Sequence, residues 1–246
     1  DRLRVLENAA FLVADSAYTA ERAREFLPER HRMRIVLPGI EPVVLVGPVD
    51  HEILAAAGEG YALIVGRTSG TESYKGHDEL LEVWPEVRRR LPAARLVVAG
   101  SGSDLARLRA KAVSLGLAWG EGSAPACDTA VCFTGQIDPA TLGELYRRAA
   151  IFAMPSLLEG FGLVYPEAMA AGKPCLALQG TAPAEIIVDG ETGRLVPQND
   201  PAALGDALVD LLGNPERARV LGEAGRRRYE REFTARAFER RFQPVV

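Results

Sequence analysis

The sequence predicts an α/β fold in which helices cover both faces of a Rossmann-like parallel sheet. The chain has 246 residues, of which 48% are hydrophobic, and this is enough for a full α/β core. From residue 61 onward, short runs rich in β-branched residues alternate with segments of helical periodicity. Such alternation predicts parallel strands joined by right-handed crossovers.

The expected elements follow one another in a regular order. The strands are YALIVG (61–66), RLVVAG (95–100), AVCFTG (130–135), AIFAMPS (150–156) and PCLALQ (174–179). The first helix between them places Leu80, Trp84, Val87 and Leu91 on one face, the next carries Leu142, Leu145 and Tyr146, and the last spans about 166–171. Residues 116–130, rich in Gly, Ala and Ser, are expected to form an inserted loop.

The two ends of the chain differ from this pattern. AFLVADS (10–16) resembles a strand, a helix is expected to open near Thr19, and PGIEP (38–42) suits a linker. We interpret residues 1–40 as the remnant of a preceding domain with its linker, and 41–230 as the main domain. Residues 231–246 are expected to form a tail helix that crosses a domain boundary.

Composition excludes several function classes. A net charge of −4 argues against a nucleic-acid partner. The odd number of cysteines, Cys127, Cys132 and Cys175, has no metal-ligand spacing and fits a reducing compartment. No apolar run approaches the roughly 20 residues of a membrane span, and no signal peptide is recognisable. We therefore expect a cytoplasmic protein.

The first loop that suits an anionic ligand is GRTSGTESYKGH. Arg67 ends a strand, and Lys75 precedes the glycine that starts the next helix. Two cations close to a helix amino end favour a diphosphate site, and His77 lies beside it. The alternative, favoured for such a pair taken by itself, is that Arg67 and Lys75 are ordinary surface charges.

The second loop, VVAGSGSDLARL, contains Gly100-x-Gly102 between a strand and a helix. A dinucleotide fingerprint would need a third glycine, and Leu105 stands in its place. We therefore expect this turn to line a cleft, with Asp104 as a helix cap. A nicotinamide enzyme stays open on this pattern alone.

The third loop, PSLLEGFGLVYPEAMAAG, combines two glycines with two glutamates in an E-x7-E arrangement. Gly160 and Gly162 allow the backbone to approach an anion, and Pro166 suits the first position of the following helix. Glu167, in the first turn, is placed to accept hydrogen bonds from a vicinal diol such as a ribose, while Glu159 faces deeper into the cleft. Favourable interaction with the helix dipole is the alternative for Glu167.

Arg67, the YKGH segment, the FTG turn (133–135) and the E-x7-E segment occur together and in order. In this combination the chain resembles glycosyltransferase family 4, the group 1 glycosyltransferases, over about residues 1–240. The resemblance implies the donor half of a GT-B fold, with residues 1–40 left from the acceptor domain.

The resemblance also implies roles for individual residues. Arg67 and Lys75 would bind the diphosphate and stabilise it as it leaves, and Glu159 would contact the transferred sugar. The loop of Gly160, Phe161, Gly162 and Leu163 would approach the sugar and phosphates, Glu167 would hold the ribose, Gly100 would line the cleft, and Gly135 and Ile137 would border the base. The implied reaction is retaining transfer of a hexose from an NDP-sugar to a glycan, lipid or small molecule.

No metal or other cofactor is implied, and the expected partners are the nucleotide-sugar donor, the acceptor and the missing amino-terminal domain. Peripheral contact with the inner face of the membrane is compatible with this class. One departure is Gly180-Thr-Ala-Pro-Ala-Glu185, where the family often has paired glycines before a donor-contacting glutamate. A non-catalytic nucleotide-sugar-binding module and a GT-B epimerase or phosphorylase stay open, as does inactivity of this chain by itself.

Overall fold

A seven-stranded, wholly parallel sheet forms the centre of the molecule. The computed structural model describes residues 2–27, 32–42, 47–121 and 129–243. The strand order is β5-β6-β4-β3-β7-β8-β9, and every pair is parallel. The strands are β3 (Ala62–Val65), β4 (Leu96–Ala99), β5 (Trp119–Glu121), β6 (Val131–Gly135), β7 (Ile151–Ala153), β8 (Cys175–Leu178) and β9 (Gly193–Val196). The predicted α/β fold class is confirmed.

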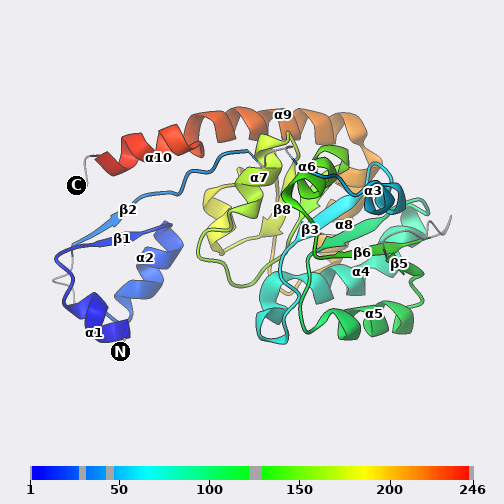
Figure 1. Cartoon of the computed structure of the whole chain (residues 1–246), viewed down its shortest axis with the longest axis horizontal. Helices are drawn as coiled ribbons and strands as arrows, with labels where there is room; N and C mark the ends of the chain where they lie inside the picture. Colours follow the sequence, from blue (N-terminus) through cyan, green and yellow to red (C-terminus); the bar gives the residue numbers. More distant parts are fainter. Residues whose placement is uncertain (1, 28–31, 43–46, 122–128, 244–246) are drawn as a thin grey trace.

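Helices pack on both faces of this sheet (Figure 1). One layer holds α4 (His77–Arg90), α5 (Leu105–Ser114) and α8 (Pro201–Gly213), with α4 packed on α8. The other holds α3 (His51–Ala57), α6 (Pro139–Arg148), α7 (Val164–Ala170) and α9 (Pro215–Glu232), with α7 packed on α9. Two short 3-10 helices, η1 (Gly70–Lys75) and η2 (Ala182–Glu185), lie in loops. The predicted apolar face of α4 buries Leu80, Trp84 and Val87.

The strand order reverses between β3 and β7. Chain segments after β3 add β4, β6 and β5 on one side, and β7, β8 and β9 follow on the other. In an open parallel sheet, the loops diverge at such a point and leave a crevice at the carboxyl ends of the strands. The three predicted ligand loops follow β3, β4 and β7, so the fold brings them to this crevice.

The amino-terminal segment is a separate small unit. It contains α1 (Arg2–Glu7), β1 (Leu12–Ala14), α2 (Ala17–Arg24) and β2 (Met33–Ile35), and β1 pairs with β2 in a two-stranded parallel sheet of its own. The helix expected near Thr19 begins two residues earlier, because Ser16 is the N-cap and its side chain accepts from the Thr19 amide. The domain boundaries near residues 40 and 230 stay predictions.

The linker is hydrogen-bonded at Ile40 to the carboxyl-terminal part of the chain. The Ile40 amide donates to the Phe233 carbonyl at 2.8 Å, and the Tyr229 hydroxyl donates to the Ile40 carbonyl at 3.0 Å. Helix α9 ends there, and α10 (Ala235–Phe242) starts anew with Thr234 as its N-cap. The carboxyl-terminal stretch is therefore two helices, with the break at the point that contacts the linker.

Several local expectations were wrong. The presumed loop over 116–130 contains the edge strand β5, where Trp119 packs edge-on against Phe133. Residues 122–128, with Cys127, lie outside the described residues, while Cys132 and Cys175 are buried free thiols. Helix α7 starts at Val164, so Pro166 is not its first residue. Its missing N–H costs nothing there, because the first four amides of a helix have no intrahelical acceptor.

Candidate functional site

Two adjoining hollows form a cleft at the carboxyl ends of the central strands. The first, of about 450 Å³, is lined by Lys75, Met154 and residues 159–164, together with Asp15 and Pro38 from the amino-terminal segment. The second, of about 280 Å³, is lined by Arg67, Ala99, Gly100, Ser101, Gln136, Ile137 and Leu142. Val65 and Gly66, at the end of β3, line both. The hollows are therefore neighbouring parts of one cleft.

Glycines in the loop after β4 allow close backbone packing beneath the second hollow. A Cβ on Gly100, whose φ is +139°, would lie 2.0 Å from the Gly66 carbonyl oxygen. A Cβ on Gly102 would lie 2.2 Å from the Thr68 carbonyl oxygen. Contact between two protein loops thus accounts for the Gly-x-Gly pattern, and it requires no dinucleotide. Gly100 itself lines the cleft.

Lys75 and Glu159 meet in the first hollow. The Lys75 Nζ and a Glu159 carboxylate oxygen are 3.0 Å apart, and the side chains are 16% and 14% exposed. Ser156 supports the pair, because its hydroxyl lies 3.1 Å from the Tyr74 carbonyl and 3.4 Å from the Glu159 carboxylate. Gly76 has φ +94° and touches Pro155, where a Cβ would lie 2.7 Å away. These contacts join the loop of Lys75 to the loop of Glu159.

Arg67 lies in the second hollow rather than beside Lys75. Its side chain is 79% exposed and forms an ion pair with Glu72. The two predicted phosphate-binding cations therefore flank the shared Val65–Gly66 segment from different sides. Arg67 itself is exposed, whereas the Glu72 side chain is only 14% exposed, so a ligand that binds Arg67 has to draw it away from a mostly buried carboxylate.

The glycine-rich loop lines the first hollow from Gly160 to Leu163. Gly162 has φ +90°, and a Cβ there would lie 2.8 Å from the Tyr165 ring, so the position requires glycine. Phe161 is buried against Phe233, with ring centroids 6.0 Å apart. The loop is thereby anchored by one buried aromatic side chain, while Leu163 stays exposed.

Glu167 lies apart from both hollows of the cleft. The Tyr146 hydroxyl donates to its carboxylate at 2.9 Å, and both residues line a different hollow with Pro42 and Arg226. Burial raises the pKa of Glu167, and the hydrogen bond from Tyr146 opposes that shift. Its expected contact with a ribose stays a prediction.

Of the base-bordering residues, Ile137 lines the second hollow, while Gly135 supports it from the backbone. The Gly100 amide donates to the Gly135 carbonyl at 3.2 Å. His77 is buried beside this region, and burial lowers its pKa to about 4. It is therefore a neutral side chain near pH 7 and adds no charge to an anion site.

Sequence reasoning did not single out Asp15, which lines the first hollow, and it left the role of Glu185 in doubt. The Glu185 carboxylate accepts from the amides of Ala17 and Tyr18, each at 2.8 Å, at the start of α2. It thus contacts the amino-terminal segment. The one local signal was the pair Ser16 and Thr19, which suits a helix start.

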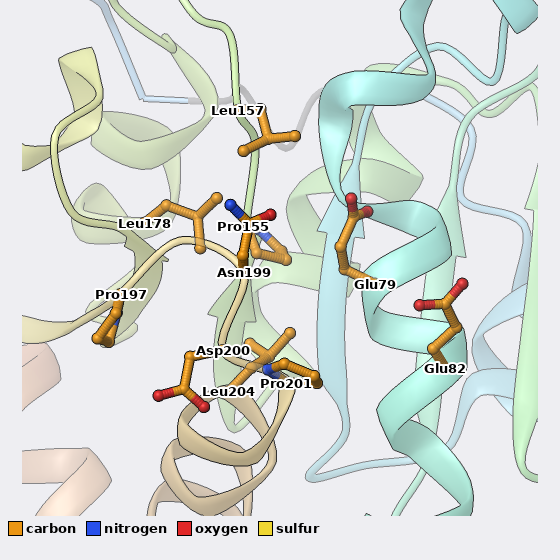
Figure 2. Close-up of a pocket in the computed structure, with 10 residues that line it drawn as sticks. All are labelled: Glu79, Glu82, Pro155, Leu157, Leu178, Pro197, Asn199, Asp200, Pro201 and Leu204. Atoms are coloured by element: carbon orange, nitrogen blue, oxygen red, sulfur yellow. The ribbon is translucent and has the colours of Figure 1, made fainter.

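A further hollow of about 320 Å³ lies on the other side of the segment after β7. Figure 2 shows Glu79 and Glu82 of α4 on one side of it and Leu178, Pro197, Pro201 and Leu204 on the other. Pro155 and Leu157 line it as well, so one short segment separates it from the cleft. None of the predicted site residues lines this hollow.

Across the described ranges, no three side chains of His, Cys, Asp or Glu form a group that could hold a metal ion. The expectation of metal-independent chemistry is not tested by this. Among the helices that the structure describes, none has the length and apolar character to span a bilayer.

Comparison with known proteins gives the family. The family "Glycosyl transferases group 1" matches residues 50–228. A GDP-mannose-dependent alpha-(1-6)-phosphatidylinositol monomannoside mannosyltransferase of Mycolicibacterium smegmatis is 37% identical over 159 residues, 62% of this chain and 39% of that protein. A D-inositol 3-phosphate glycosyltransferase of Nocardia farcinica is 35% identical over 222 residues, 84% of this chain and 46% of that protein. The chain thus spans less than half the length of these two relatives.

Solved structures agree on the architecture. A sucrose-phosphate synthase from Thermosynechococcus elongatus superposes with a TM-score of 0.78 at 28% identity, over 99% of this chain and 59% of that one. Anabaena HepE in complex with UDP-glucose also gives 0.78, at 18% identity, over 99% of this chain and 66% of that one. The predicted GT-B relationship is confirmed, and the chain belongs to the group 1 glycosyltransferases.

Proposed function

We propose that this chain is the donor-binding part of a retaining glycosyltransferase that transfers a hexose from a nucleoside-diphosphate sugar, without a metal ion. The observation that carries the proposal is the Lys75–Glu159 ion pair, held beside the glycine-rich loop in the first hollow. The remainder of the enzyme, including the acceptor domain, is proposed to lie outside residues 41–230.

The proposed layout follows the cleft from end to end. The base and ribose occupy the second hollow beside Ile137, the diphosphate crosses Gly66, and the hexose enters the first hollow at Glu159. Glu167 is proposed to reach the ribose after leaving Tyr146. Backbone amides of Gly160 to Gly162 supply neutral donors where the hexose and phosphate meet.

The proposed chemistry is a displacement at the anomeric carbon. An acceptor hydroxyl attacks on the face from which the diphosphate departs, and the bond from that carbon to the phosphate oxygen breaks with its electron pair going to the phosphate. The hydroxyl proton passes to the departing oxygen. Lys75 and Arg67 stabilise the negative charge that develops there, and Glu159 orients the hexose while holding Lys75 in place. The three protons of the Lys75 ammonium allow both contacts at once.

The relatives suggest which donor to test first. One is named as GDP-mannose-dependent, and HepE was solved with UDP-glucose, so GDP-mannose is our proposed donor and UDP-glucose its competitor. Because the first relative acts on a phosphatidylinositol mannoside, a lipid-linked or glycan acceptor and a cytoplasmic enzyme at the inner face of a membrane are proposed with it.

Isothermal titration of the chain with UDP, GDP, ADP and their glucose and mannose conjugates tests the donor site. We expect saturable binding of one nucleotide family and its loss in Lys75→Ala, because this cation faces the diphosphate. Arg89→Ala is the matched control, since Arg89 is an exposed cation paired with Glu86 within α4. Equal binding by wild type and Lys75→Ala would contradict the proposal.

Turnover and stereochemistry are measured on the full-length enzyme. Lys75→Ala is expected to lower turnover about a hundredfold or more, the usual effect of losing a charge that stabilises the transition state. The anomeric configuration of the product, read by NMR, should match that of the donor. An inverted product would exclude the retaining reaction, and binding without turnover would favour a non-catalytic module.

A further inference from the structure

We propose that Asp15 is a specificity-determining residue whose carboxylate accepts a hydrogen bond from a hydroxyl of the donor's hexose. The inference rests on the proposed function, since it takes the first hollow to be the hexose site. Asp15 lies at the end of β1, in the amino-terminal segment, and none of the sequence motifs includes it.

Asp15 lines the same hollow as Lys75 and Glu159. It does not line the second hollow, where Gln136 and Ile137 lie. Its position is therefore at the end of the cleft remote from the proposed base. A group placed there meets the hexose and not the nucleotide.

The glycine at position 160 leaves room for the Asp15 carboxylate. A Cβ on Gly160 would lie 3.0 Å from the Asp15 Oδ2 and 3.7 Å from the Thr19 hydroxyl. The backbone of Gly160 is not in the left-handed region, so its conformation alone does not require glycine. A side chain at position 160 would crowd the Asp15 carboxylate, which would have to shift by a few tenths of an ångström.

Four hydrogen bonds of the residues that follow Asp15 fix it in this position. The hydroxyls of Ser16 and Thr19 donate to the Gly160 carbonyl at 2.6 and 3.0 Å. The Glu185 carboxylate accepts from the first two amides of α2. Figure 1 shows α2 beside the segment that leads into α7, in agreement with these bonds. The start of α2, directly after Asp15, is therefore held against both the glycine-rich loop and η2.

The Asp15 carboxylate also has acceptor capacity left over. Glu159 is paired with Lys75, whereas the one side-chain contact that the described residues give Asp15 is a long one, 3.4 Å to the Ser16 hydroxyl, whose proton goes to the Gly160 carbonyl at 2.6 Å. An ionised carboxylate has about four acceptor sites. Beside Glu159, the Asp15 carboxylate is a second negative charge in the first hollow, and it would repel a diphosphate. The suitable partner of Asp15 is therefore a neutral hydroxyl group.

Calorimetry on the same chain tests the assignment with UDP, UDP-glucose, GDP and GDP-mannose. Asp15→Asn and Asp15→Ala are expected to weaken the sugar conjugate by about tenfold to a hundredfold, the loss of a hydrogen bond to a charged group. The free nucleotide should keep its affinity within about twofold, because it lacks the hexose, the group that Asp15 is proposed to contact. Glu21→Gln is the matched control, because it removes an exposed carboxylate from α2.

Each outcome decides the matter. Selective loss of conjugate binding in both Asp15 variants, with Glu21→Gln unchanged, supports the assignment. Unchanged conjugate binding overturns it, and so does equal weakening of conjugate and free nucleotide, which would mark a structural role. If the wild-type chain binds none of the four ligands, the proposed function fails first and the inference falls with it.

Discussion

Individual side chains in the cleft are already engaged with one another. Lys75 is paired with Glu159 and Arg67 with Glu72, so a diphosphate would compete with carboxylates for both cations. Replacing one of these carboxylates with an amide removes its negative charge. The effect of that charge on nucleotide binding can then be measured separately from the effect of the sugar contact on turnover. The Lys75–Glu159 pair is the better test, because both partners are largely buried and solvent screens them less.

Glu159→Gln is expected to bind free nucleoside diphosphate at least as tightly as wild type, because Lys75 is no longer neutralised. Turnover of the full-length enzyme should fall about a hundredfold through loss of the contact with the hexose. Titration with the free nucleotide and an initial-rate assay measure the two effects. Tenfold weaker nucleotide binding would instead show that Glu159 mainly holds Lys75 in position.

His77 is expected to make stability depend on pH. Its pKa is 6.5 when unfolded and about 4 in the buried native site, so the unfolded state binds the extra proton between these values. The contribution is constant above pH 6.5 and stability falls as pH decreases toward 4, by about 3 kcal/mol in all. Denaturant unfolding of wild type and His77→Gln across this range should show that difference, with His51→Gln as an exposed control. Parallel pH profiles would refute it.

The elements differ in how well the sequence predicts them. Strands β3, β4, β7 and β8 are found because each is a short apolar run with a glycine or proline close to its end, and β6 because Val131, Cys132 and Phe133 form such a run before Thr134 and Gly135. Strand β5 was missed because it contains Trp119, Gly120 and Glu121 and borders a small-residue loop, and its strand character comes from pairing with β6. Lys75 and Glu159 were selected as candidates because each directly precedes a glycine in a loop after a predicted strand. Asp15 was not singled out, and the role of Glu185 was left in doubt, because their contacts bridge more than 140 positions, as the 168-residue separation of Glu185 and Ala17 shows.

Glu185→Ala is expected to loosen α2 from η2. The change leaves the Ala17 and Tyr18 amides without their carboxylate acceptor, at a cost of about 1–3 kcal/mol for the docked segment. Limited proteolysis should then cleave within residues 1–40 faster than in wild type, while the exposed control Glu191→Ala should not differ. An unchanged cleavage rate would mean that these bonds do not hold the segment.

At the scale of the whole molecule, the closing helices tie the parts together. Arg228 of α9 donates to the carbonyls of Glu185 and Ile186 at 3.0 and 2.7 Å, and Phe233 lies between Arg228 and Phe161. One stretch of chain therefore contacts the linker, η2 and the glycine-rich loop. The sequence indicated helices here, but the break at Phe233–Thr234 depends on contact with Ile40 and could not be read from periodicity.

Phe233→Ala is expected to destabilise the protein by about 3–5 kcal/mol, since the side chain is fully buried. Nucleotide-sugar affinity should fall as well, because Phe161 loses the ring that anchors its loop. Denaturant unfolding and calorimetry measure the two effects, with the partly exposed Phe242→Ala as control. A cost below about 1 kcal/mol would contradict the packing described.

The bonds from Ser16 and Thr19 to the Gly160 carbonyl also have a thermodynamic consequence. They make the conformation of the ligand loop and the docking of α2 parts of one equilibrium, and such coupling is reciprocal. Suppose that docking of residues 16–19 on the loop increases the affinity for a ligand by a certain factor. Binding of that ligand must then increase the equilibrium constant for docking of residues 16–19 by the same factor. Amide hydrogen exchange at the start of α2 should therefore slow on adding a ligand whose own contacts lie on the other side of the loop.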